Sequence, residues 1–221
     1  NSHLVLNRAE SDYVQVLNSG TAFDFVHNTG VFFFGAHLSV ASDGTLMNIA
    51  DTAAASTLNR GIFFTKTAAN RVRFAVTRGS SGTYVYDCTS AASLTASMGV
   101  VPVWFIGGGA SGARFRVGSA AVETCARSNA PTAAGNAAQI LWIGRTSSGG
   151  NAFDGRIQDI VITSKIPSAA DITAFESWNP ARTSTSLVRW VGADRGYYNF
   201  LVRDYDFTGV FSAICSDTTA T

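Results

Sequence analysis

"NAFDGRIQDIVITSKIPSAADITAFESW", residues 151–178, is the stretch that decides the fold class of this chain. An Asp-Gly turn introduces a β-prone run in which Ile157, Ile160 and Ile162 share one face. Because their spacing is not a clean alternation, we expect a β-bulge near Gln158–Asp159. The stretch therefore opens with a core strand that carries an irregularity.

The second half of the same stretch predicts one short helix near residues 168–178. Ser168, followed by an aspartate three positions later, resembles a capping box with Asp in place of Glu. A helical apolar stripe follows, made of Ile172, Phe175 and Trp178. We expect this helix to cover an edge of the sheet, which is a known use of such an element.

The remainder of the chain is all-β in pattern. Short apolar runs recur every 8 to 12 residues or so, with Gly, Ser, Thr or Asn at the breaks, as in a sandwich or barrel. The run 30–40 is almost continuously apolar and predicts a strand buried on both faces. The run 71–77 alternates and predicts one wet face: Val72, Phe74 and Val76 point inward, and Arg71, Arg73 and Ala75 outward.

The closing segment resembles that of the laminin G-like, concanavalin A-like jelly-roll domains. These domains end on an apolar strand with Ile-Gly, a loop, an F-x-G-x-I-x-[DE] strand and a short helix. The matching positions here are Leu141–Gly144, Phe153, Gly155, Ile157, Asp159 and Ala170–Ile172. The resemblance covers about residues 12–178 and implies an antiparallel two-sheet jelly-roll sandwich. It implies little about function, because the matching residues are packing and turn residues and the fold hosts glucanases, lectins and phage structural proteins alike.

The domain organisation that we expect is a single jelly-roll domain over residues 1–221. Residues 12–178 form its laminin G-like core, and residues 179–221 add strands at Leu187–Val191 and Tyr198–Val202. These strands would extend a sheet or contribute an oligomer contact.

Composition excludes several partner classes. The formal net charge is +1, which gives no electrostatic case for nucleic acid, and no apolar run approaches the length of a membrane span. The chain starts at Asn1 without a recognisable secretory signal, which we interpret as a processed or trimmed end. Cys88, Cys125 and Cys215 lack metal-site spacing, so we expect three thiols acting as small core residues, although one pair could bridge.

No catalytic motif is recognisable in the sequence. The glucanases of this fold use a Glu-x-Asp-x-x-Glu strand, and the run that begins at Glu10 and Asp12 has Gln15 in the third position. An amide cannot transfer the proton, so the acid/base pair is incomplete. The glycine-rich run 107–112 lacks the ending of a phosphate loop and is interpreted as a hairpin.

Two candidate sites remain. The richest polar and aromatic cluster predicts a ligand-binding surface at Asp194, Arg195, Tyr197, Tyr198 and Asn199, with a hairpin or subunit contact as the alternative. Calcium is the candidate metal, held at oxygen-rich turns by Asp43, Asp51, Asn151 and Asp154, with ordinary turn preference as the alternative. Both tryptophans in apolar strands, Trp104 and Trp142, are predicted to lie in the core.

The hypothesis that follows is a non-catalytic module that binds glycans or another host surface. Lysine occurs at Lys66 and Lys165 alone, and the abundance of small residues is common in phage proteins, so we expect part of a virion or tail-type structural protein. Its partners would be carbohydrate, other virion proteins and further copies of itself, in a virion or extracellular location. The alternatives are a purely architectural capsid or decoration protein and a divergent polysaccharide-degrading enzyme.

Overall fold

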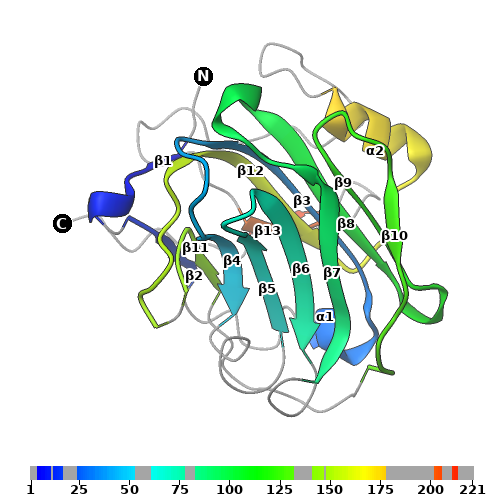
Figure 1. The fold of residues 1–221 in the computed structure, drawn as a ribbon. Helices are drawn as coiled ribbons and strands as arrows, with labels where there is room; N and C mark the ends of the chain where they lie inside the picture. Colours follow the sequence, from blue (N-terminus) through cyan, green and yellow to red (C-terminus); the bar gives the residue numbers. More distant parts are fainter. Residues whose placement is uncertain are drawn as a thin grey trace.

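Two mainly antiparallel sheets pack against each other in a jelly-roll sandwich, which confirms the predicted fold class (Figure 1). The computed structural model describes residues 4–10, 12–16, 24–52, 61–77, 83–131, 141–146, 148–177, 202–205 and 211–213. Within these ranges the first sheet has eight strands and the second has six.

The eight-stranded sheet has the order β10-β9-β8-β3-β12-β13-β14, and β1 also pairs with β12. Its strands are β1 (Leu4–Leu6), β3 (Val31–Val40), β8 (Val101–Gly108), β9 (Ala113–Val117), β10 (Glu123–Cys125), β12 (Gly155–Thr163), β13 (Val202–Tyr205) and β14 (Phe211–Ala213). The register of β12 against β3 shifts between Ile157 and Asp159, so the predicted bulge is confirmed. β12 and β13 run parallel, unlike the other pairs of this sheet within the described ranges.

The six-stranded sheet has the order β2-β11-β4-β5-β6-β7. Its strands are β2 (Val14–Val16), β4 (Met47–Thr52), β5 (Gly61–Lys66), β6 (Arg71–Thr77), β7 (Tyr84–Ser93) and β11 (Leu141–Ile143). The inward and outward faces of β6 are those that the alternation predicted, since Val72, Phe74 and Val76 lie in the core. Ala75 points outward but has no exposed surface.

The core lies between the sheets and is rich in phenylalanine. Phe34, Phe64, Phe74, Phe105 and Phe115 form a chain of ring contacts across it, with centroids 4.6 to 6.3 Å apart. Each of these rings has at most 2% of its surface exposed. Such pairs add to the stability that area burial supplies, and they hold the two sheets in one relative position.

The helix α2 (Ala169–Glu176) lies on the outer face of the eight-stranded sheet. Phe175 packs on Phe33, Trp104 and Ile106, so the helix covers the centre of the sheet. The sequence had led us to expect that it covers an edge, and this expectation is wrong. The reason is an apolar patch on the outward side of β3 and β8, which would otherwise face water. Gly35 makes the contact possible, because a Cβ there would lie 2.8 Å from Cζ of Phe175.

The helix is fixed at both of its ends. At the start, the predicted capping box is confirmed: Ser168 Oγ accepts from the Asp171 backbone N–H, and the Asp171 carboxylate accepts from the Ser168 backbone N–H. At the end, the Glu176 carboxylate accepts from Nε1 of Trp104 at 2.7 Å and from Nη1 of Arg116 at 2.9 Å. Trp104 is therefore buried as predicted, but beneath this helix and outside the main core.

The shorter helices lie in the connections. A five-residue helix that the sequence analysis did not predict, α1 (Asp24–Asn28), places Val26 in the main core. Five residues are too few to show a helical period. Single 3-10 turns occur at Arg8–Glu10, Ala96–Met98 and Gly109–Ser111. The last of these connects β8 to β9, so the glycine-rich run is a hairpin, as expected.

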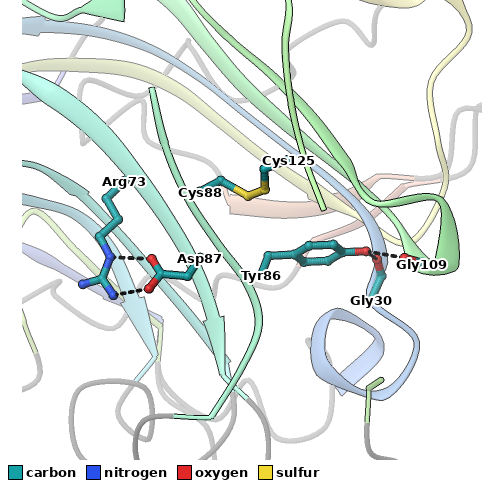
Figure 2. Close-up of a disulfide and its surroundings, with 7 residues drawn as sticks. All are labelled: Gly30, Arg73, Tyr86, Asp87, Cys88, Gly109 and Cys125. Atoms are coloured by element: carbon teal, nitrogen blue, oxygen red, sulfur yellow. Dashed lines mark hydrogen bonds and ion pairs between the residues drawn. A yellow bond between two sulfur atoms is a disulfide. The ribbon is translucent and has the colours of Figure 1, made fainter. Parts of the chain in front are cut away.

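A disulfide between Cys88 and Cys125 joins the two sheets at one lateral edge, which corrects the expectation of three free thiols (Figure 2). Cys88 lies on β7 of one sheet and Cys125 on β10 of the other, with their Cα atoms 6.0 Å apart. The sequence separation of 37 gives no local signal, because only the stacking of the sheets brings the two edge strands together.

The same edge is closed by hydrogen bonds. The Glu123 carboxylate accepts from the backbone N–H groups of Ala91 and Ala92 at 2.7 and 3.2 Å. Farther along, the backbone N–H of Ser128 donates to the Val85 carbonyl at 2.9 Å. These contacts cover the open side of β7, which limits pairing with another chain.

The ends of the chain meet at β12. Its first residues pair with β1 and its later residues pair with β13. β13 and β14 extend the eight-stranded sheet. The predicted strand at Leu187–Val191, and that at Tyr198–Val202 apart from Val202, lie outside the described residues. In the described part of the chain no helix has the length and apolar character that a membrane span requires.

Candidate functional site

The outer face of the six-stranded sheet carries a row of side chains at matching register positions. Trp142 of β11 lies opposite Asp51 of β4, Asp51 opposite Phe63, Phe63 opposite Ala75, and Ala75 opposite Asp87 of β7. All five point away from the core because their strand neighbours are core residues. Asp51 and Ala75 have no exposed surface, so the accessible members are Trp142 and Asp87 at the two ends and Phe63 between them.

The first end of the row holds a cluster of Tyr13, Trp142 and Arg145, which we call the aromatic–arginine cluster. The rings of Tyr13 and Trp142 are 5.2 Å apart between centroids. Cζ of Arg145 lies 3.3 Å from the centroid of Tyr13 and 4.7 Å from that of Trp142. These three distances describe a triangle, so the guanidinium lies over both rings without being sandwiched between them.

The local sequence explains how the cluster forms. Leu141 and Ile143 alternate with Trp142 and face the core, which forces the indole outward. Gly144 follows with φ +87° and turns the chain, so that Arg145 lies back over the indole. The Arg145 carbonyl accepts from Nδ2 of Asn48 at 2.6 Å, which ties this turn to β4.

The cluster is accessible and incompletely satisfied. Tyr13 is 41% exposed, and Trp142 and Arg145 are half-buried. Nε1 of Trp142 and Nε of Arg145 are shielded from solvent and have no hydrogen-bond partner among the residues that the structure describes. The accessible part of the cluster is therefore its ring surface and the remainder of the guanidinium, a combination of apolar and donor groups that is typical of a polar-ligand site.

The other end of the row holds a neutralised pair. Nε and Nη2 of Arg73 donate to the two carboxylate oxygens of Asp87 at 2.7 and 2.8 Å (Figure 2). The hydrogen bond to Asp87 raises the pKa of Arg73 well above its usual range, against the opposing effect of burial. The guanidinium also lies 5.4 Å from the centroid of Tyr84. A bidentate pair leaves this arginine little capacity for a ligand, so this end is the weaker candidate.

The sequence-predicted ligand residues Asp194, Arg195, Tyr197, Tyr198 and Asn199 lie outside the described residues, and that hypothesis stays a prediction. The predicted metal ligands are all described but serve other contacts or are buried. Oδ1 of Asp43 accepts from the backbone N–H of Ala96, Asp51 is buried on the sheet face, and the carbonyls of Asn151 and Asp154 accept from backbone N–H groups.

No three His, Cys, Asp or Glu side chains come together as a metal site within the described ranges. Asp43, Asp51 and Asp154 therefore do not converge on one ion. Calcium binding at an individual turn remains a prediction.

The chain has three glutamates, Glu10, Glu123 and Glu176, and the last two make structural contacts. Glu123 closes the edge of the sandwich and Glu176 anchors α2, as described above. Glu10 is exposed in a 3-10 turn, and the neighbouring Asp12 carboxylate accepts from the backbone N–H of Asn7 at 3.0 Å. His37 lies beneath α2, with Nε2 3.0 Å from the carbonyl oxygen of Phe175.

Sequence reasoning missed the aromatic–arginine cluster. It assigned Trp142 to the core because the run around it is apolar, and that assignment is wrong, since the indole lies on the outer face. The alternation of Leu141, Trp142 and Ile143 was the signal that could have placed it there. Arg145 has no such signal, because its position depends on the turn at Gly144.

Comparison with known proteins finds a likeness in fold alone. No family model and no curated protein matches the sequence. The chain is similar to a solved structure of the Ruminococcus gnavus IT-sialidase CBM40 bound to α2,3-sialyllactose, with a TM-score of 0.56 and 11% identity over 80% of this chain and 96% of that one. It is also similar to the binding domain of botulinum neurotoxin DC in complex with SialylT, with a TM-score of 0.52 and 14% identity over 75% of this chain and 39% of that one.

Proposed function

We propose that this chain is a non-catalytic glycan-binding module and that the aromatic–arginine cluster is its contact surface. The observation that carries the proposal is the pairing of the Tyr13 and Trp142 rings with the Arg145 guanidinium on an accessible part of the sheet face. Pyranose rings present an apolar C–H face and a rim of hydroxyl groups. An aromatic surface with adjacent donors complements both features.

Two further facts support the proposal. Two of the fold neighbours above were solved as complexes, one with sialyllactose and one with SialylT. At 11% and 14% identity, the likeness to them concerns the fold. The disulfide between Cys88 and Cys125 favours an oxidising compartment, which agrees with a module that meets glycans outside the cytosol.

The wider setting is also part of the proposal. We place the module in a virion or tail-type structural protein, acting as a homo-oligomer beside other virion proteins. The support is compositional: lysine occurs at two positions, and small residues are abundant. Mass spectrometry of purified particles tests this setting, and absence of the chain from particles would refute it without affecting glycan binding.

The experiment for the binding function is a glycan array with the full chain, in calcium and then in EDTA. Selective binding supports the module, and loss of binding in EDTA would support calcium at the turns of Asp43 or Asp154. Absence of binding in both buffers would refute the proposal and favour the architectural alternative. Release of reducing sugar from a bound polysaccharide would instead favour the enzyme.

Variants then locate the binding surface. Tyr13→Ala removes an exposed ring and should weaken binding by about ten-fold, which corresponds to roughly 1.4 kcal/mol. Val122→Ala is the control, because Val122 is 50% exposed in the connection between β9 and β10 of the other sheet. Equal effects of the two variants would contradict the assignment of the surface.

A further inference from the structure

We propose that Arg145 makes this surface selective for saccharides that carry a carboxylate. The inference rests on the proposed glycan-binding function and adds the chemical class of the ligand and the residue that recognises it. The Arg145 guanidinium contacts two aromatic rings but has no carboxylate partner among the described residues.

The contacts of Arg145 leave its hydrogen-bonding capacity unused. Its guanidinium carbon lies over the rings of Tyr13 and Trp142, and these cation–π contacts do not neutralise its charge. Arg145 forms no ion pair and donates no side-chain hydrogen bond within the part of the chain that the structure describes. The guanidinium, whose Nε is shielded from solvent, therefore offers the N–H groups of its two Nη atoms, with no complementary anion among the described residues.

Two other half-buried arginines show what this chain does elsewhere. Arg73 is paired with Asp87 through two hydrogen bonds. Arg116 is paired with Glu176, with side-chain exposures of 26% and 20% for the two partners. Arg127 and Arg145 are also half-buried but have no such carboxylate in the described ranges, and of these two it is Arg145 that lies over aromatic rings. A ligand carboxylate would take the position that Asp87 and Glu176 occupy for the other two.

The neighbouring groups are consistent with an acceptor-only ligand. Nε1 of Trp142 is shielded from solvent, so the indole offers its ring face and not a donor to the ligand. The nearest acidic neighbour in register, Asp51, has no exposed surface, so its carboxylate is not presented to the incoming group. A carboxylate matches the guanidinium fork in two parallel hydrogen bonds, and because a tetrahedral oxyanion can also bind the fork in this way, a sulfated probe is included in the test.

The test is a calorimetric comparison of matched saccharides on the full chain. The probes are trigalacturonate, its neutral galactose counterpart and a sulfated galactose trimer, alongside sialyllactose and lactose. Variants are Arg145→Gln, Arg145→Lys and the control Arg114→Gln, an exposed arginine on β9 of the other sheet. Circular dichroism and thermal unfolding verify that each variant folds.

We expect the wild type to bind at least one carboxylate probe about ten-fold more tightly than its neutral counterpart, with an affinity that falls as salt rises. Arg145→Gln should remove that preference and its salt dependence, and should weaken carboxylate binding more than neutral binding. Arg145→Lys should restore the salt dependence but only part of the preference, since lysine keeps the charge without the fork. Arg114→Gln should change nothing.

Four results would overturn the inference. Equal binding of acidic and neutral saccharides would remove the carboxylate preference and leave the glycan-binding function intact. An equal weakening of acidic and neutral saccharide binding in Arg145→Gln would show that Arg145 supports the rings and does not select the carboxylate. A stronger preference for the sulfated probe would replace the carboxylate by another anion. Absence of binding to every saccharide would refute the proposed function together with the inference.

Discussion

Reduction of the Cys88–Cys125 bridge should lower the stability of the whole sandwich. The bridge joins β7 to β10 across the two sheets and closes a loop of 37 residues. The chain-entropy relation for a loop of that size gives about 4 kcal/mol at 25 °C. For a chain of this length each kcal/mol corresponds to roughly 2 to 4 °C, so the midpoint of thermal unfolding should fall by about 8 to 16 °C.

The assay compares thermal and urea unfolding of the native protein with and without a phosphine reductant, after peptide mapping under non-reducing conditions has verified the bridge. The matched control is the double variant Cys88→Ala/Cys125→Ala, which has no bridge to reduce. It should unfold near the midpoint of the reduced wild type, and reductant should not shift it further. A shift below about 3 °C on reducing the wild type would refute the loop-entropy reasoning.

The further predictions concern four single positions. The Tyr86 hydroxyl donates to the Gly30 carbonyl at 2.8 Å (Figure 2), so Tyr86→Phe should cost about 1 to 2 kcal/mol in urea unfolding. Burial raises the pKa of Tyr86, so wild-type stability should fall as the pH rises above about 10, and the same variant should reduce that fall; an unchanged pH profile would contradict the role of the hydroxyl. Burial lowers the pKa of Lys66, which disfavours its charged form in the folded state. The contribution of Lys66 to stability should therefore rise as the pH rises toward about 10.5, and Lys66→Met should remove that contribution in the same titration. Ser168→Ala removes the cap of α2 and should cost about 1 kcal/mol, with Ser168→Thr retaining most of the stability in the same assay; equal losses would argue against capping. Gly35→Ala places a Cβ against the ring beneath α2 and should cost roughly 1 to 3 kcal/mol, measured by urea unfolding, with local loss of hydrogen-exchange protection in the helix as the distinguishing readout.

Much of the fold could be predicted from local pattern. The alternation in 71–77 assigned the faces of β6, the unbroken apolar run 30–40 marked β3 as buried on both sides, and the irregular spacing near Gln158–Asp159 located the bulge. Ser168 marked the start of α2 three residues ahead of its partner. Each of these features depends on neighbours within a few positions, so the local sequence contains the necessary information.

The candidate site could not be predicted in the same way. Tyr13 and Trp142 are separated by most of the chain and meet because β2 and β11 are paired in the six-stranded sheet. The half-burial of Trp142 follows from that pairing, while its apolar strand neighbours suggested a core position. A site assembled from separate strands depends on their order and register, and neither is encoded in local periodicity.

The sequence by itself determined the two-sheet β-sandwich, the alternating faces of its strands and the capped helix after β12, because periods of two and of 3.6 residues and a cap are local properties. The tertiary structure decided where that helix lies, that Cys88 pairs with Cys125, and that Arg145 lies over two rings without a carboxylate partner among the described residues. Those outcomes depend on which surfaces the sheets bring together: the patch under Phe175, the edge at Cys88 and Cys125, and the turn that lays Arg145 over two rings.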